Sequence, residues 1–142
     1  MKEFFLILFF AKSIVVTPEP IDIVDSVSLK FAEPVSAITS GAHIRIDVTD
    51  SVRDSVGLAN IVAVLDYLKK KYPDGSVSAS LTTATGEATI LDKTGGSANA
   101  ESAQLILLSS TGVPTGIDFS EVEIVSTADL KGVSVTWQNH YK

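Results

Sequence analysis

Residues 133–138, Val-Ser-Val-Thr-Trp-Gln, alternate apolar and polar side chains with a period of two. Successive side chains of an extended strand point to opposite faces, so Val133, Val135 and Trp137 should share a buried face. Shorter runs of strand-like residues, bounded by Gly, Pro, Asp or Ser, recur along the chain at 21–23, 27–31, 44–48, 77–81, 88–90, 105–108 and 121–124. About eight such strands predict a mainly β fold, an antiparallel β-sandwich or jelly roll.

One segment, 58–71, follows a helical period instead. Its apolar residues recur at the spacing of one helix face: Leu58, Ile61, Val62, Leu65 and Leu68. Asp54 or Asn60 could cap its start, and the lysines at 69–71 complement the negative end of the helix dipole. Pro73 and Gly75 end it. We therefore expect a single amphipathic helix across one end or edge of the sandwich.

The segments between these runs are predicted to be turns and loops. The spacing of the last two strands predicts a hairpin turn at 128–132. A turn is expected at 92–96, and flexible loops are expected at 95–100 and 109–116, where small and polar residues gather. None of these loops is long enough to separate two domains, so 13–142 is expected to form a single domain.

Composition excludes several classes of function. The chain has 142 residues, of which 45% are hydrophobic and 20% charged, enough for a packed core. A formal net charge of −6 repels phosphate backbones, so nucleic acid is not an expected partner. The absence of cysteine excludes disulfides, thiolate metal sites, thiol catalysis and a lipoprotein anchor.

The first twelve residues form a segment of their own. Phe4 to Ala11 is apolar throughout, but as a helix it would span only roughly 12 Å, short of a bilayer core of about 30 Å. Residues 1–12 therefore indicate a signal peptide or a buried N-terminal strand rather than a transmembrane segment. We expect a periplasmic or secreted protein. The alternative is a virion or cytoplasmic protein that retains the N-terminal strand.

Three acidic residues, Asp47, Asp50 and Asp54, lie between a predicted strand and the predicted helix. Clustered carboxylates could bind calcium, which takes six to eight oxygen ligands. The alternative is turn and helix-cap chemistry, since Asp satisfies free backbone amides. The two histidines, His43 and His140, lack the spacing of a zinc site and are expected at the surface. No cofactor is expected.

No stretch of the sequence carries a catalytic motif. There is no G-x-S-x-G elbow, no phosphate-binding loop of the G-x-x-x-x-G-K-[ST] type and no G-x-G-x-x-G. Glu121 and Glu123 share one face of a predicted strand, which is first of all a solvated face. Trp137 belongs to the predicted core, and Tyr67 and Tyr72 beside the helix give only weak support to sugar binding.

The end of the chain carries one resemblance to a known family. Gly132, the alternating strand 133–137 and the penultimate Tyr141 resemble the closing strand of chaperone–usher fibre subunits. The glycine is closer to the end than in that family, and the family's disulfide pair is missing. The resemblance implies that an extended segment, 14–23, could complete a neighbour's sheet by strand addition, although Pro18 and Pro20 remove two backbone donors.

Together these patterns predict a non-enzymatic binding or assembly protein, either exported or a subunit of a surface fibre or virion. A protein partner or self-association is expected. Two alternatives remain open. One is a small carbohydrate- or calcium-binding module. The other is a small hydrolase whose site centres on Asp47, Asp50, Asp54 or His43.

Overall fold

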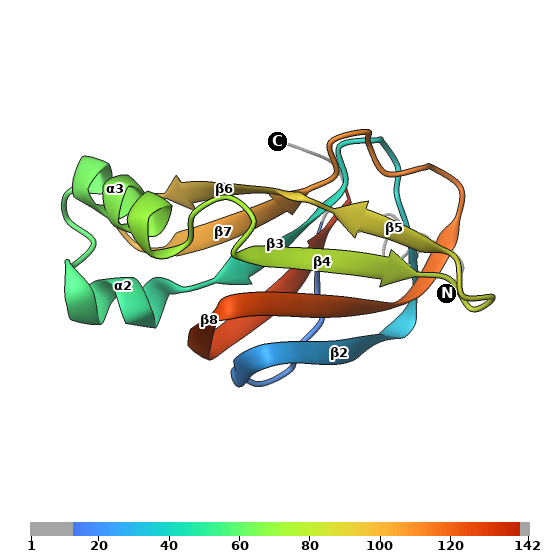
Figure 1. The fold of residues 1–142 in the computed structure, drawn as a ribbon, viewed down its shortest axis with the longest axis horizontal. Helices are drawn as coiled ribbons and strands as arrows, with labels where there is room; N and C mark the ends of the chain where they lie inside the picture. Colours follow the sequence, from blue (N-terminus) through green and yellow to red (C-terminus); the bar gives the residue numbers. More distant parts are fainter. Residues whose placement is uncertain (1–12, 140–142) are drawn as a thin grey trace, which may run out of the picture.

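The computed structural model describes residues 13–139 and confirms a mainly β fold (Figure 1). Within this range the chain forms eight strands and two helices, in the following order: β1 Ser13–Val15, β2 Ile21–Ser36, β3 His43–Asp47, α2 Thr49–Ser55, α3 Ile61–Lys71, β4 Val77–Thr82, β5 Ala88–Leu91, β6 Lys93–Ala98, β7 Ala103–Leu108 and β8 Asp118–Gln138. Every strand pairing is antiparallel.

The long strand β8 organises the sheet. Its first part pairs with β2 and β4, and its last part pairs with β1 and β3. The sheet order is β5-β4-β8-β3-β7-β6, with β1 and β2 also on β8. Because β8 belongs to both halves, the strands form one curled sheet like a half-barrel, in which the two stacked layers of a sandwich or jelly roll are not clearly separate (Figure 1).

The hairpin predicted at 128–132 is wrong, because this segment lies inside β8. Buried apolar positions in β8 are even-numbered from Val122 to Leu130 and odd-numbered from Val133 onward. The change of phase coincides with Gly132, which has a φ of +59°, and with a register shift against β2 between Ile21 and Ile23. This is the behaviour of a β-bulge, which bends a strand and re-aims its side chains without ending it. The bulge lets one strand bury apolar residues in both halves of the curl.

The turn predicted at 92–96 and the flexible loop at 95–100 are also wrong in large part, because β6 occupies most of this segment. Only Asp92 separates β5, which pairs with β4, from β6, which pairs with β7. The chain thus passes from one end of the sheet order to the other. Across this seam the Thr94 hydroxyl donates to the Val77 carbonyl oxygen at 2.9 Å. Pairing with β7 overrides the low strand propensity of Gly95 and Gly96.

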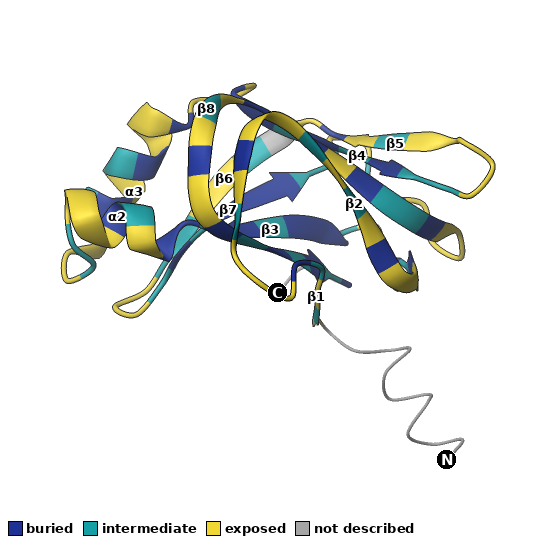
Figure 2. Cartoon of the chain, turned by 90° about the horizontal axis from the view of Figure 1, so that it is seen from below, coloured by how far each residue is buried: buried dark blue, intermediate teal, exposed yellow. Residues whose placement is uncertain are grey.

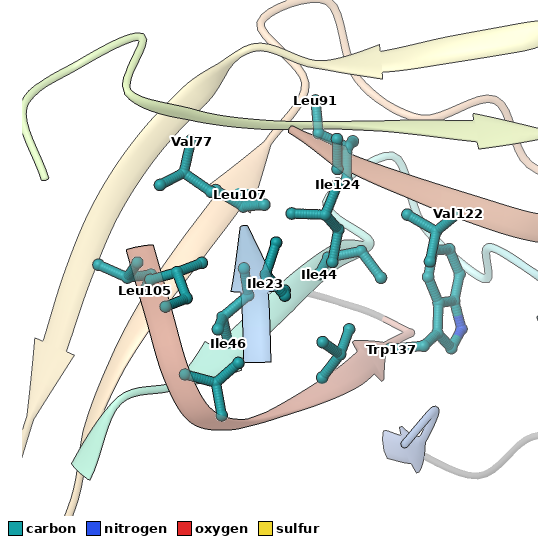
Figure 3. Packing of buried hydrophobic residues seen from close by; sticks show 14 of the residues in the cluster. Ile23, Ile44, Ile46, Val77, Leu91, Leu105, Leu107, Val122, Ile124 and Trp137 are labelled. Carbon is teal, nitrogen blue, oxygen red and sulfur yellow. The ribbon is translucent and has the colours of Figure 1, made fainter. Parts of the chain in front are cut away.

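The apolar core fills the inside of the curl. Side chains from β3, β7 and β8 converge there with β2 and β4, as Figure 3 shows for Ile44, Leu107 and Ile124. The predicted buried face of 133–137 is confirmed, and Trp137 is fully buried. Its ring packs edge-on against Phe31, at 6.2 Å between ring centroids.

Two helices, rather than the single one expected, lie at one end of the sheet (Figure 1). Helix α2 was not predicted, because only Thr49 and Val52 of its seven residues are buried and no apolar period marks it. Helix α3 begins at Ile61 rather than Leu58. Of the two residues expected to cap this helix, Asn60 does so: its side chain accepts a hydrogen bond from the Ala63 amide at 3.1 Å.

The N-terminal part of the described chain completes its own sheet. Strand β1 pairs with the end of β8, and Ile21 and Ile23 pair with residues of the same strand. Within one chain, therefore, both ends of segment 14–23 are already paired. The predicted signal peptide or buried strand at 1–12 lies outside the described residues. Neither α2 nor α3, the helices of the described part, is long and apolar enough to cross a membrane.

Candidate binding groove

A groove of about 370 Å³ lies between helix α3 and strand β6. Helix α3 and the turn that follows it form one wall, while strands β6 and β7 form the other. The residues that line it are mainly apolar or glycine: Leu65, Leu68, Lys69, Tyr72, Pro73, Asp74, Thr94, Gly95, Gly96 and Leu105. The groove therefore runs along β6, the last strand in the sheet order.

Strand β6 is an edge of the sheet. Among the described strands it pairs with β7 alone, so its other side carries backbone groups without a strand partner. Gly95 and Gly96 are both exposed. A Cβ atom at Gly95 would meet nothing within 4 Å, whereas one at Gly96 would lie 3.1 Å from Leu68 Cδ1. Glycine at 96 thus lets the helix approach the face of the strand closely, and open space lies where a side chain at 95 would project.

Helix α3 and the segment before it also expose apolar side chains. Helix α3 buries Val64 and Leu68 against the sheet. Four apolar side chains on α3 and the segment before it remain exposed, and we call them the helical apolar patch: Val56, Ile61, Val62 and Leu65, which are 46%, 43%, 76% and 39% exposed. Figure 2 shows exposed segments along both helices at this end of the molecule. Leu65 belongs both to the patch and to the groove.

Positive charge gathers at the end of α3 beside the groove. Lys70 forms an ion pair with Asp66 at 3.1 Å. Lys71 Nζ lies 5.6 Å from the centre of the Tyr67 ring and 5.8 Å from that of Tyr72. Hydrogen bonding to Tyr67 raises the pKa of Lys71. Lys69 lines the groove and has no ion-pair partner within residues 13–139.

The prediction that His43 lies at the surface is wrong, because its side chain is fully buried. Arg45 Nε donates to His43 Nε2 at 3.0 Å, so Nδ1 carries the proton and donates to the Gly41 carbonyl at 2.9 Å. Arg45 Nη1 donates in turn to Gln104 Oε1 at 3.0 Å. Burial and the nearby Arg45 charge lower the pKa of His43. His43 is thus a neutral link in a hydrogen-bonded chain that joins β3 to β7.

The three calcium candidates have separate surroundings. Asp47 accepts a hydrogen bond from the Thr49 amide at 2.9 Å, which is the expected helix-start chemistry. Asp50 forms an exposed ion pair with Arg53 at 3.0 Å, and Asp54 is exposed. In the part of the chain that the structure describes, no three His, Asp or Glu side chains are grouped to hold a metal ion. His140 lies outside that part.

The remaining sequence candidates are spread over the molecule. Glu123 is exposed on β8 and Glu121 is half-buried there, away from the groove. Trp137 is in the core, where its Nε1 donates to Asn139 Oδ1 at 3.2 Å. Tyr72 is buried, while the partly exposed Tyr67 donates a hydrogen bond from its hydroxyl to Ser55 at 3.1 Å and so ties α3 to α2.

Sequence reasoning missed the groove because it treated the Gly95-Gly96 segment as a loop. The signal that was present is the helical period of α3, in which Ile61, Val62 and Leu65 extend the apolar surface beyond one narrow face. Comparison with known proteins adds no guide to function, since no model of a protein family, no curated protein and no solved structure matches the chain.

Proposed function

We propose that this chain is a non-enzymatic binding or assembly protein that docks another protein at its helical end. The observation that carries the proposal is the helical apolar patch. Val62 is 76% exposed, and its neighbours on the patch are more than one-third exposed. Apolar surface exposed beside a groove is typical of sites where proteins meet, because contact removes that surface from water.

The contacts of the acidic and histidine candidates support binding over catalysis. A hydrolase or calcium site would draw on Asp47, Asp50, Asp54 or His43. Both ring nitrogens of His43 are engaged by Gly41 and Arg45, and Asp47 holds the start of α2. These contacts give the side chains structural roles in the sheet and at the helix, and the groove contains none of them.

The cellular setting remains part of the proposal. An exported protein, or a subunit of a surface fibre or virion, agrees with a docking surface and with the apolar segment 4–11. The intact mass of protein recovered from its native source tests this directly. Loss of the segment through about residue 12 is the result expected for export, whereas the full-length mass would favour retention in a particle or in the cytoplasm.

Photo-crosslinking tests the docking surface itself. A photoreactive benzoylphenylalanine in place of Val62 lies on the patch, and the same group in place of Val24 is a matched control on β2, where the side chain is 57% exposed. In an extract of the native source, position 62 should yield discrete crosslinked species that position 24 does not. Identical products from both positions, or none from position 62, would overturn the proposal.

A further inference from the structure

We propose that the occupant of the groove is an extended peptide segment of a partner protein, added as a strand to the free edge of β6. The segment carries a bulky apolar side chain that enters the groove and an acidic residue that meets Lys69. This inference rests on the proposed binding function and names the chemistry of the partner.

The free edge of β6 supplies the backbone part of the site. An edge strand presents unpaired amide and carbonyl groups, which an extended chain can satisfy by pairing. Native edges are commonly protected by bulky or charged side chains or by a covering element. Here the centre of the edge is Gly95-Gly96, both exposed, with open space where the Gly95 side chain would be. Nothing attached to the strand at these two positions blocks an incoming backbone.

The groove supplies the side-chain part of the site. Alternate side chains of an added strand point to opposite faces, so every second one would face the groove. The wall they meet consists of Leu65 and Leu68 from α3, Tyr72 after the helix and Leu105 from β7. Such a wall favours a bulky aliphatic or aromatic side chain, since its burial removes apolar surface from water.

The charge beside the groove favours one kind of residue next to the apolar side chain of the peptide. Lys70 and Lys71 already have Asp66, Tyr67 and Tyr72 as neighbours, whereas Lys69 faces the groove without an ion-pair partner in the described chain. The three lysines at the end of α3 outnumber the two carboxylates beside them, Asp66 and Asp74, so an added carboxylate meets net positive charge although the whole chain carries −6. An acidic residue next to the apolar anchor is therefore favoured over a basic one.

Selection from a library of random dodecapeptides displayed on phage tests this chemistry on the full chain. The enriched peptides should share alternating apolar or β-branched residues with Asp or Glu beside a bulky apolar one. A synthetic peptide of the consensus should lose at least tenfold in affinity for Leu65→Lys and for Lys69→Glu. It should bind Lys131→Glu, a charge reversal on the exposed part of β8, as tightly as the unmodified protein.

Amide chemical shifts locate the bound peptide without relying on variants. The largest changes should fall on 94–97 and on α3. Failure to enrich any peptide, equal affinity for all variants, or shift changes confined to other strands would overturn the inference. Concentration-dependent changes at 94–97 without peptide would overturn it in favour of a second copy. The crosslink from position 62 is independent of all these readouts, so the binding function can stand while this occupant fails.

Discussion

Strands β8 and β6 show two opposite ways of using a strand in the same sheet. β8 has neighbours on both sides and buries apolar side chains along its length, including Phe119, Ile124 and Trp137. β6 has one neighbour, and two of its six residues are exposed glycines. The first strand provides stability, and the second is left open at the point where the apolar helix α3 lies beside it.

One glycine in each strand, Gly132 in β8 and Gly95 in β6, shows a similar contrast. Gly132 in β8 has a φ of +59° and makes the bulge that carries the strand around the core. Its amide donates to Asp22 Oδ1 at 2.8 Å, which fixes the bulge against β2. Gly95 in β6 has neither a left-handed backbone nor a close neighbour. One glycine is required by backbone geometry, whereas the other has open space beside it.

The largest expected effect comes from removing the aromatic anchor of β8. Trp137→Ala should lower the free energy of unfolding by about 3–5 kcal/mol, because it leaves a cavity between Phe31 and Phe119. Val125→Ala, on the exposed side of the same strand, should change it by less than about 0.5 kcal/mol. Urea denaturation of both variants measures the difference. Equal losses would contradict the assignment of the buried face.

The bulge itself is tested by alanine at the two contrasting glycines. Gly132→Ala should cost about 1–2 kcal/mol, since a Cβ atom is strained in the left-handed region while open space surrounds it. Gly95→Ala should be nearly neutral in stability. The same denaturation measurement applies, and a larger loss at position 95 than at position 132 would reverse the comparison.

Substitutions at Asn60, the cap of α3, test how this helix is held beside β6. Asn60→Ala removes the acceptor of the Ala63 amide and should cost about 1 kcal/mol. Asn60→Asp is the matched control, because a carboxylate can accept the same hydrogen bond and should retain most of the stability. Thermal unfolding followed by circular dichroism measures both variants. Equal melting temperatures for the two variants would show that the cap contributes little.

The smallest effect is expected from the pH dependence of the β3–β7 contact. The pKa of buried His43 is below the 6.5 of an unperturbed histidine, so the unfolded chain binds a proton first as the pH falls. Its contribution to stability should be constant above about pH 6.5 and decline below it, until the folded-state pKa is reached. The urea midpoint of the native protein should therefore fall between about pH 7 and pH 5, and that of His43→Gln should fall less. Parallel profiles would contradict a neutral, buried His43.

Sequence alone predicts the parts of this fold whose side chains carry a period. The alternation at 133–138 places Trp137 in the core, and the helical spacing after Asn60 places α3. Sequence alone does not predict the segments whose structure depends on backbone geometry and strand pairing. The Gly132 bulge looks like a turn in the sequence, but β2, distant in sequence, pairs with β8 on both sides of it. The Gly95-Gly96 segment looks like a loop, but pairing with the next strand, β7, holds it in a strand. The prediction that His43 lies at the surface fails for a related reason, because its burial depends on tertiary contacts.

Hydrogen exchange of backbone amides, followed by NMR, tests the central contrast between the closed strand β8 and the open strand β6. In the free protein the amides of β8 in the stretch paired on both sides by β2 and β4, 122–126, should exchange slowest, near the rate set by global unfolding. Alternate amides of β6, those facing away from β7, should exchange fast and become protected when the selected peptide binds. Slow exchange at every β6 amide in the free protein would contradict an open edge and, with it, the proposed binding groove.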